Sequence, residues 1–350
     1  MQKDKRLVVT FLAIIFGIFL CIPCKFILVK MGIMSMNKDN FSEYKGNTEK
    51  NIVDKLNNIV GKIENNIENK VTNYFPLYSN LNTLYQRVNF ASNKLLFKDV
   101  PIKTNRDGEY IFYDKVNEFY YLTNKYSDEE LDARLEKQVK FFNELSNKGI
   151  NVNIYIPTRY EFTELKENNL SKFLDEFVNK LDSKINTRVM NVTSIDEYKK
   201  YFYKTDHHWT IYGALDGYQD ICDMLGIQKL NDLNALEHKE KKYYGSLAKT
   251  ALNDSINDYI SDVDIKLDYD VYVNGKETDK LFKPREIRLD RDYKYYDYYV
   301  QYFNGQYGSV VYDYHDERKE NLLIVGDSYS WQIDYLIASS FNKTHVINLR

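Results

Sequence analysis

Between Ser127 and Gly226 the sequence alternates helical patterns with short apolar segments, and this alternation constrains the fold more than any other feature. Apolar residues at steps of three and four predict helices, while short apolar runs predict strands. The expected order is a helix opened by a capping box at 127–130, a strand over 150–157, a helix over 171–185, a strand over 188–192 and a helix over 211–225. Strands joined by helices favour an α/β fold with a mostly parallel sheet flanked by helices.

The C-terminal third has a different pattern. Tyr, Asp and Val alternate over residues 260–315, and Asn274-Gly275 is a strong signal for a hairpin turn. We interpret this stretch as a β-rich insertion, followed by a last apolar strand over 322–325. A chain of 350 residues can bury one large core, so we expect a single α/β domain over 96–350 with appended N-terminal segments.

The N-terminus predicts a membrane anchor. Three basic residues precede an uncharged stretch over 7–24, and the apolar character continues over 26–29. That length can span a bilayer, and the basic flank favours a cytoplasmic N-terminus. A cleaved signal peptide is one alternative, but no A-x-A-like site follows the run. A lipid-anchored Cys24 is another, although Pro23 fits such a site badly. We expect residues 1–29 to form a cytoplasmic tail and a single-pass anchor in the cell membrane, with the domain that follows extracytoplasmic.

Residues 30–95 are expected to form a stalk and an amphipathic helical region. Residues 30–50 are polar and mixed, and a stripe of isoleucine, leucine and valine at helical spacing follows over 52–71. This helix must pack one side on a partner, either a second copy of the chain or the main domain.

Charge and cysteine content narrow the class of protein further. The net charge is −3, from 48 basic and 51 acidic residues with no long block of either sign, so no nucleic-acid partner is indicated. Beyond the expected anchor, Cys222 is the only cysteine; it cannot form an internal disulfide, and its apolar neighbours predict a core position. The 32 tyrosines fit either a compositional bias or platforms for sugar rings.

Two short segments hold the groups of a nucleophilic catalytic system. Asp206-His207-His208-Trp209 places a carboxylate two residues from an imidazole, and Gly326-Asp327-Ser328 places a serine directly after the apolar run. A serine hydroxyl is a weak nucleophile and needs a base to take its proton. Histidine, with an ordinary pKa of about 6.5, can serve, and a carboxylate on its other nitrogen fixes the tautomer.

The spacing also predicts how these residues face one another. In an extended segment residues i and i+2 point to the same side, so we expect Asp206 and His208 to share the site and His207 to point away in a supporting role. Ser328 follows the carboxyl end of a buried strand, where α/β sheets bind ligands. The turn after it offers the N–H groups of Ser328 and Tyr329 to a developing oxyanion.

Each segment also has a simpler interpretation. Gly-Asp-Ser turns commonly cap helices without any chemistry, and Asp327 is placed to do so. An Asp-His-His cluster is a possible metal site, but adjacent histidine side chains diverge and only three other histidines exist in the chain. The occurrence of both segments in one exported α/β chain favours catalysis, and we expect no metal or cofactor.

The chain resembles the DHHW family of bacterial exported proteins, which are relatives of the alginate O-acetyltransferases and contain an SGNH-hydrolase-like domain. The resemblance covers about residues 70–350 and is carried by the motifs at 73–76, 107–113, 204–210, 244–247 and 323–330. It implies an SGNH-hydrolase-like fold, with Ser328 as the nucleophile, His208 as the base and Asp206 as the partner of that base.

The family also suggests substrates and secondary site residues. The resemblance implies transfer of acetyl groups to hydroxyls of cell-surface or extracellular polysaccharide, with a membrane-bound O-acyltransferase as the possible acyl donor. Gly245 is a candidate oxyanion donor, with a simple turn glycine as the alternative. Trp209 and Trp331, the only two tryptophans, each lie within three residues of a proposed catalytic residue. We therefore include both, with Tyr329 and His207, among the candidate substrate-binding or oxyanion residues.

Three functions remain open at this point. The first is the O-acetyltransferase, and the second is a polysaccharide acetyl esterase with the same Ser-His-Asp residues. The third is a non-catalytic surface scaffold or polysaccharide-binding protein with a decayed site. It is motivated by the sequence ending 22 residues beyond Ser328, where related proteins usually continue.

Overall fold

The computed structural model describes residues 78–103, 110–123, 126–166, 170–277, 293–302 and 307–348. The expected anchor over 1–29, the helix over 52–71, and the motifs at 73–76 and 107–108 lie outside the described residues. Among the helices of the described ranges, none is long and apolar enough to cross a membrane.

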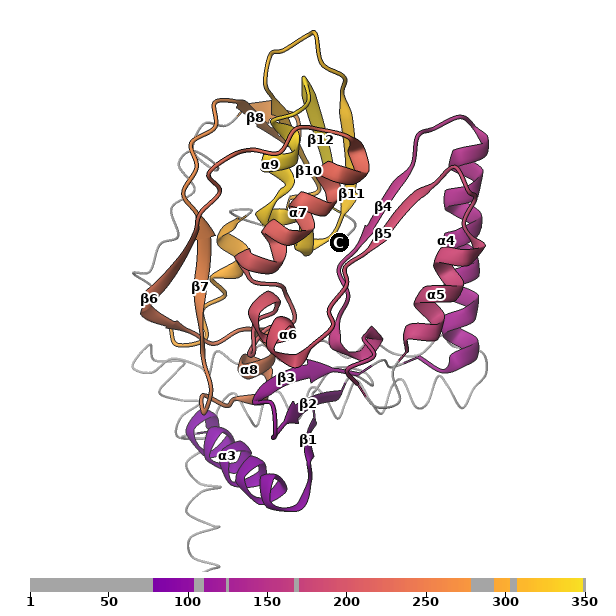
Figure 1. The fold of residues 1–350 in the computed structure, drawn as a ribbon. Helices are drawn as coiled ribbons and strands as arrows, with labels where there is room; N and C mark the ends of the chain where they lie inside the picture. Colours follow the sequence, from indigo (N-terminus) through magenta and orange to yellow (C-terminus); the bar gives the residue numbers. More distant parts are fainter. Residues whose placement is uncertain are drawn as a thin grey trace, which may run out of the picture. The chain divides into compact units, whose positions relative to one another are not determined.

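The largest sheet has five strands in the order β11-β12-β10-β8-β9 (Figure 1). Their bounds are β8 (Asp270–Val273), β9 (Lys276–Glu277), β10 (Ser309–Asp313), β11 (Leu322–Gly326) and β12 (Lys343–Asn348). Only β11 and β12 run parallel; the other neighbours in this sheet are antiparallel. A separate pair, β4 (Asn153–Ile156) and β5 (Asn186–Val189), is also parallel.

The α/β class is confirmed, but the expectation of a mostly parallel sheet is wrong. Within the β-rich stretch expected over 260–315, the described strands β8, β9 and β10 belong to this sheet. Parallel strands need long crossovers, whereas antiparallel strands can be joined by a short turn. The predicted turn at Asn274-Gly275 is such a connection between β8 and β9, and both residues have the positive φ, 49° and 78°, that it requires.

Two smaller antiparallel sheets complete the strands of the described residues. The first contains β1 (Asp99–Lys103), β2 (Tyr110–Asp114) and β3 (Phe119–Leu122). The second pairs β6 (Ala235–Tyr243) with β7 (Asp258–Val263), with a register shift between Glu237 and Lys242.

The helices largely follow the sequence pattern. They are α3 (Tyr78–Leu96), α4 (Asp128–Asn147), α5 (Ser171–Lys180), α6 (Ile195–Tyr201), α7 (Ile211–Leu225), α8 (Ser246–Ala251) and α9 (Asp334–Ala338), with 3-10 turns η1 (Tyr160–Phe162), η2 (Tyr299–Tyr302) and η3 (Ser328–Gln332). The capping box is present at Ser127 and Glu130. Gly149 follows α4 with φ +80° and Gly226 ends α7 with φ +66°, as expected of helix-terminating glycines.

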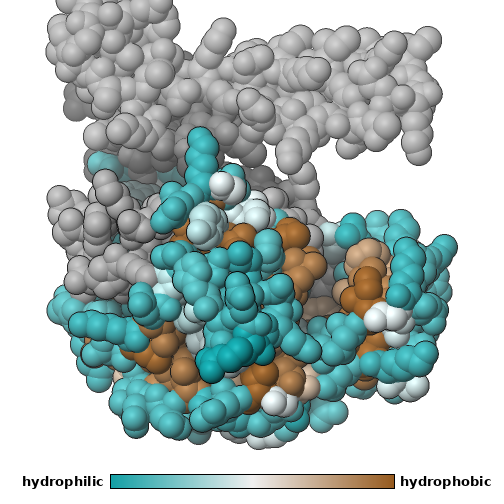
Figure 2. All heavy atoms as spheres, turned by 90° about the horizontal axis from the view of Figure 1, so that it is seen from above, coloured by the Kyte–Doolittle hydropathy of each residue, from teal (hydrophilic) through white to brown (hydrophobic). Residues whose placement is uncertain are grey.

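The core is rich in aromatic side chains and lies around α7, whose helix packs against β4, β5 and α9. The largest side chains that are less than 2% exposed include Trp209, Tyr218, Tyr243, Tyr298, Tyr299, Tyr302 and Tyr312. Cys222 is a free thiol with no exposed surface, which confirms the predicted core position. Figure 2 shows that hydrophobic side chains on the face seen from above form separate patches among hydrophilic ones.

Close packing at the start of α7 generates a stability prediction. A Cβ at Gly213 would lie 2.4 Å from the carbonyl oxygen of Tyr201, and a backbone atom cannot move aside cheaply. We expect Gly213→Ala to lower the free energy of unfolding by about 1–3 kcal/mol, measured by urea denaturation. Gln219→Ala, on an exposed position of the same helix, should change it by less than about 0.5 kcal/mol. Equal stability of the two variants would refute this packing constraint.

Candidate active site

The Asp-His-His-Trp segment lies in a tight loop between α6 and α7. An isolated antiparallel bridge joins Phe202 to Trp209, and the Tyr203 N–H donates to the His208 carbonyl at 3.1 Å. The residues between are bent and not extended. The expected alternation of side chains therefore does not apply, and the loop closure determines which groups meet.

Thr205 and Asp258 hold this loop against β7 and α8. The Asp258 carboxylate accepts from the Thr205 N–H at 2.7 Å, the Thr205 hydroxyl at 2.6 Å and the Lys204 N–H at 3.1 Å. The Thr205 carbonyl accepts the N–H groups of Leu247 and Ala248, both at 3.1 Å. Burial raises the pKa of Asp258, while these donors oppose that shift.

Asp206, His208 and Ser328 form a continuous hydrogen-bonded chain. Asp206 Oδ1 lies 2.6 Å from His208 Nδ1, and His208 Nε2 lies 2.7 Å from Ser328 Oγ. Ser328 comes directly after β11 and begins η3, and the Asp327 side chain caps that turn by accepting the Tyr329 N–H at 3.0 Å. Asp206 is 3% exposed, His208 6% and Ser328 0%. Two segments 120 residues apart thus place the groups of a Ser-His-Asp system within hydrogen-bond reach.

The second carboxylate oxygen of Asp206 is also satisfied. Oδ2 accepts the Ser246 N–H at 2.6 Å and the Tyr243 hydroxyl at 2.9 Å. Burial acts to raise the pKa of Asp206, but the histidines at 208 and 207 and the Ser246 N–H outweigh it and hold that pKa well below its ordinary value. The carboxyl is therefore ionised at neutral pH.

Gly245 supports Asp206 by its small size. A Cβ at this position would lie 2.4 Å from the Asp206 Cβ and 2.6 Å from Oδ2, so the close approach of α8 to the carboxylate requires glycine. The Gly245 N–H donates to Thr205 Oγ1 at 3.0 Å. The structure therefore does not support the expected oxyanion role for Gly245, because its donor is already used.

His207 lies beside His208, in contrast to the expectation that it points away. The two rings have centroids 3.9 Å apart. His207 Nδ1 lies 2.9 Å from Ser246 Oγ and 3.4 Å from Asp206 Oδ1. This position follows from the bent loop and places His207 at the edge of the site.

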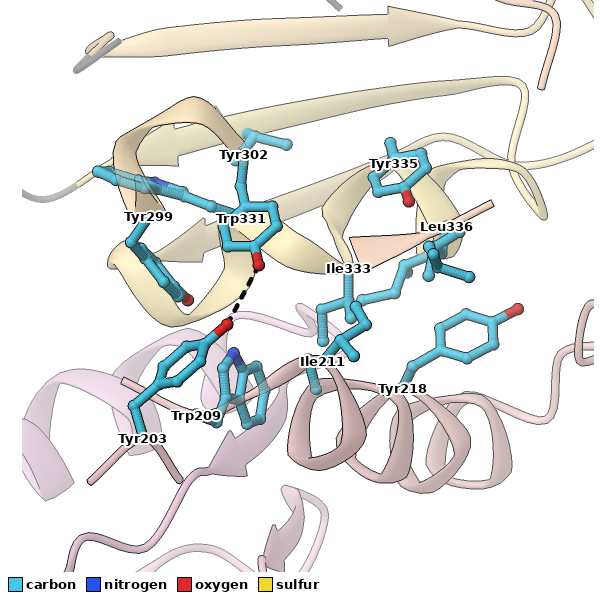
Figure 3. Close-up of a cluster of buried hydrophobic side chains, with 14 of the residues drawn as sticks. Tyr203, Trp209, Ile211, Tyr218, Tyr299, Tyr302, Trp331, Ile333, Tyr335 and Leu336 are labelled. Carbon is cyan, nitrogen blue, oxygen red and sulfur yellow. Dashed lines mark hydrogen bonds between the residues drawn. The ribbon is translucent and has the colours of Figure 1, made fainter. Parts of the chain in front are cut away.

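The other candidate substrate contacts lie differently from what the sequence suggested. The Tyr329 N–H is donated to Asp327, and its hydroxyl donates to the His207 carbonyl, so neither group is aimed at an oxyanion. Trp209 and Trp331 are 1% and 3% exposed and belong to the buried cluster shown in Figure 3. Both tryptophans are therefore core residues, and neither is among the residues that line the neighbouring cleft.

The alternative of a metal site involves the same residues. Ligand atoms of Asp206, His207 and His208 lie within 4.8 Å of one another. His208, however, already uses both ring nitrogens, one with Asp206 and one with Ser328. A metal ion would have to replace one of these hydrogen bonds, so we describe the cluster as a hydrogen-bonded chain.

Sequence reasoning missed several supporting residues. Tyr243, Ser246 and Asp258 bind the loop or its carboxylate, and Tyr299 stacks on the His208 ring with centroids 3.8 Å apart and planes 8° apart. The motif at 244–247 was a usable signal for Ser246. Tyr299 lies in a tyrosine-rich stretch where nothing distinguishes it from its neighbours.

A cleft of about 800 Å³ borders this chain of residues. Its polar lining includes Arg159, His207, Ser246, Thr250, Asp327 and Tyr329. Apolar side chains, mainly from α4, α5 and β4, form most of the remaining wall. Arg159 pairs with Glu161 at 2.8 Å, which partly neutralises the cationic side of the cleft. The cleft reaches the residues on both sides of Ser328, while Ser328 itself is covered.

Comparison with known proteins shows which solved structures have a similar fold. No protein-family model matches the sequence, and no curated protein matches it. Among solved structures, PatB1 of Bacillus cereus with a sulfonyl adduct is similar at a TM-score of 0.56 and 18% identity, over 71% of this chain and 87% of PatB1. A second PatB1 structure gives 0.54 and 18%, over 72% and 88%. A DHHW family protein from Eubacterium siraeum gives 0.52 and 18%, over 71% and 86%. The chain has the fold of a DHHW family protein. The resemblance to the DHHW family is therefore confirmed at the level of the fold.

The buried carboxylate generates a prediction about pH and stability. Because the Asp206 pKa is lowered on folding, its charged form stabilises the protein above the ordinary aspartate pKa of about 3.9, and this contribution is lost as pH falls through the lower folded value. We expect Asp206→Asn to lower the free energy of unfolding by about 2 kcal/mol at pH 7. The difference from wild type should shrink below about pH 4.

Urea denaturation at a series of pH values measures this difference. The control is Asp264→Asn, which changes an exposed carboxylate and should cost less than about 0.5 kcal/mol at every pH. A deficit for Asp206→Asn that stays constant from pH 7 to the acid limit would show that the carboxylate's charge does not stabilise the fold.

Proposed function

We propose that this protein is an extracytoplasmic O-acetyltransferase that transfers acetyl groups to polysaccharide hydroxyls through an acetyl ester on Ser328. The observation that carries the proposal is the chain Asp206–His208–Ser328, with contacts of 2.6 and 2.7 Å, beside a cleft. The fold of a DHHW family protein supports it, together with the motifs that resemble that family.

The proposed reaction has two steps, acetylation of Ser328 and transfer of the acetyl group to a sugar hydroxyl. Ser328 Oγ attacks the acetyl carbonyl carbon of a donor ester while His208 Nε2 takes the hydroxyl proton, and the same proton then passes to the departing donor oxygen. In the second half, His208 takes the proton of a sugar hydroxyl, whose oxygen attacks the acetyl-serine. The proton returns to Ser328 as its ester bond breaks, and the acetylated sugar leaves.

Asp206 supports both halves electrostatically. Its carboxylate is ionised at neutral pH, since its pKa lies well below the ordinary value. It accepts the His208 Nδ1 proton at 2.6 Å, which directs Nε2 toward Ser328 and stabilises the imidazolium that forms in each step.

Transfer and hydrolysis would use the same residues and would differ in whether a sugar hydroxyl or water reaches the acyl-enzyme. Ser328 has no exposed surface and His208 is 6% exposed, and this covering restricts donor ester, sugar and water alike. An esterase would use the same residues but would need water at the ester. A large separation of Ser328 and His208, with no pocket between them, would favour the non-catalytic alternative, and the 2.7 Å distance beside a cleft argues against it.

The proposal includes a location and partners. The basic flank and apolar run over 1–29 support a single-pass anchor that holds the domain outside the cytoplasm. The acceptor would then be a cell-surface or exopolysaccharide hydroxyl, and a membrane-bound O-acyltransferase would supply the acetyl group.

Covalent labelling tests the nucleophile. PatB1, which shares the fold, carries a sulfonyl adduct in one of its structures, so a sulfonyl fluoride is a suitable probe. We expect phenylmethylsulfonyl fluoride to add one sulfonyl group to Ser328, found by peptide mass spectrometry, and Ser328→Ala to remain unlabelled. Ser330→Ala is the matched control, because Ser330 Oγ donates to the Asp327 carbonyl and does not contact His208. Equal labelling of wild type and Ser328→Ala would exclude Ser328 as the nucleophile.

Product partitioning tests transfer against hydrolysis. The purified full chain is incubated with a chromogenic acetyl ester, with and without a polysaccharide-derived oligosaccharide, and acetate and acetylated sugar are quantified. We expect the oligosaccharide to raise total turnover and to receive most of the acetyl groups, because a transferase passes the acyl group to a sugar hydroxyl faster than to water. Release of acetate alone, at a rate that the oligosaccharide does not change, would identify an esterase.

A further inference from the structure

Tyr299 contacts two members of the hydrogen-bonded chain at once. Its ring lies face to face on the His208 imidazole, with centroids 3.8 Å apart and planes 8° apart. Its hydroxyl donates to the Ser328 carbonyl oxygen at 3.0 Å. One side chain from η2 therefore joins the loop that carries the base to the turn that carries the proposed nucleophile.

The surrounding core fixes the Tyr299 ring. Tyr302 meets it edge to face with centroids 5.0 Å apart, and Trp331 lies 6.1 Å from it on another side. Tyr302 is in turn held by a 3.3 Å hydrogen bond with Tyr203, drawn in Figure 3. Tyr299 is only 1% exposed. This burial is the main cause that raises the pKa of its phenol well above the ordinary value. The phenol therefore keeps its proton and remains a donor to Ser328.

The ring face also has an electrostatic consequence. The face of an aromatic ring carries partial negative charge, so it attracts a cation more strongly than a neutral group. His208 alternates between neutral imidazole and imidazolium in the proposed reaction. A tyrosine face at 3.8 Å favours the charged form, which is the form produced as the proton leaves Ser328.

We propose that Tyr299 is a positioning residue that keeps His208 and Ser328 at hydrogen-bond distance and favours the imidazolium form of His208. The inference rests on the proposed function. It assigns to the tyrosine-rich segment before β10 a role in the chemistry, in addition to its role in the core.

Several other groups face His208 and stay unchanged in the test. Asp206 bonds its Nδ1 at 2.6 Å, and the rings of His207 and Tyr329 lie 3.9 and 5.4 Å from its ring. The carboxyl of Asp297, two residues before Tyr299, interacts with His208 electrostatically. All four persist when only residue 299 is replaced, so a change in the titration of His208 reports on the Tyr299 ring.

Two variants separate the two contributions. Tyr299→Phe keeps the ring face and removes the hydrogen bond to Ser328. Sulfonyl labelling should slow by about fivefold at every pH, with the acid limb of the pH–rate profile unmoved. Tyr299→Leu keeps an apolar cover but removes the ring face. The acid limb should then move to lower pH by about one unit.

Tyr302→Phe is the matched control, because it removes a buried tyrosine hydroxyl of the same turn and keeps the ring that packs against Tyr299. It should leave the acid limb in place. Should Tyr299→Leu fail to fold, pentafluorophenylalanine at position 299 replaces it, since this ring keeps the shape of phenylalanine and reverses the charge on its face. Compared with Tyr299→Phe, it should lower the midpoint of the limb.

Nitrogen-15 NMR titration of the His208 ring provides a readout without any reaction, so the inference is tested even if Ser328 is not labelled. An unlabelled wild type would refute the proposed function. A His208 titration midpoint that is the same in wild type, Tyr299→Leu and Tyr302→Phe would refute the role of Tyr299. A rise in Tyr299→Leu would refute it equally.

Discussion

The site depends on the 2.6 Å hydrogen bond between Asp206 and His208, and much of the surrounding structure serves to hold it. The bridge between Phe202 and Trp209 closes the loop, and the buried Asp258 carboxylate fixes Thr205 beneath it. Because Gly245 has no side chain, α8 approaches closely enough for Ser246 to donate to the second carboxylate oxygen. An ionised carboxylate can be buried here because each of its oxygens has donors.

The same bond connects distant parts of the chain. His208 reaches across to Ser328 at the end of β11, and Tyr299 from the tyrosine-rich segment covers the imidazole and bonds the Ser328 backbone. The sheet that carries Ser328 includes β8, β9 and β10 from that C-terminal region. The strand-rich part therefore supports the turn that carries the proposed nucleophile, and its Tyr299 ring covers the His208 imidazole.

Much of this arrangement could be predicted from the sequence, and the failures have physical causes. Helix ends at Gly149 and Gly226, the hairpin at Asn274-Gly275 and the capping box are local signals, and all are confirmed. The direction of a strand relative to its neighbours is not set by local sequence, so the prediction of a mostly parallel sheet was wrong. The prediction that His207 points away from the site was wrong because the loop is bent. The contacts of Asp258 and Tyr299 with the site join residues 53 and more than 90 positions away, and no sequence pattern marks them.

The most direct test of the proposed mechanism is detection of the acyl-enzyme. Full-length protein is mixed with a chromogenic acetyl ester, quenched in acid within milliseconds to seconds, and digested for peptide mass spectrometry. The mechanism predicts one acetyl group on the peptide that contains Ser328, absent in His208→Ala and lost from wild type after an oligosaccharide is added. An unmodified Ser328 peptide during steady turnover, or an acetyl group on another residue that forms and decays at the turnover rate, would contradict it.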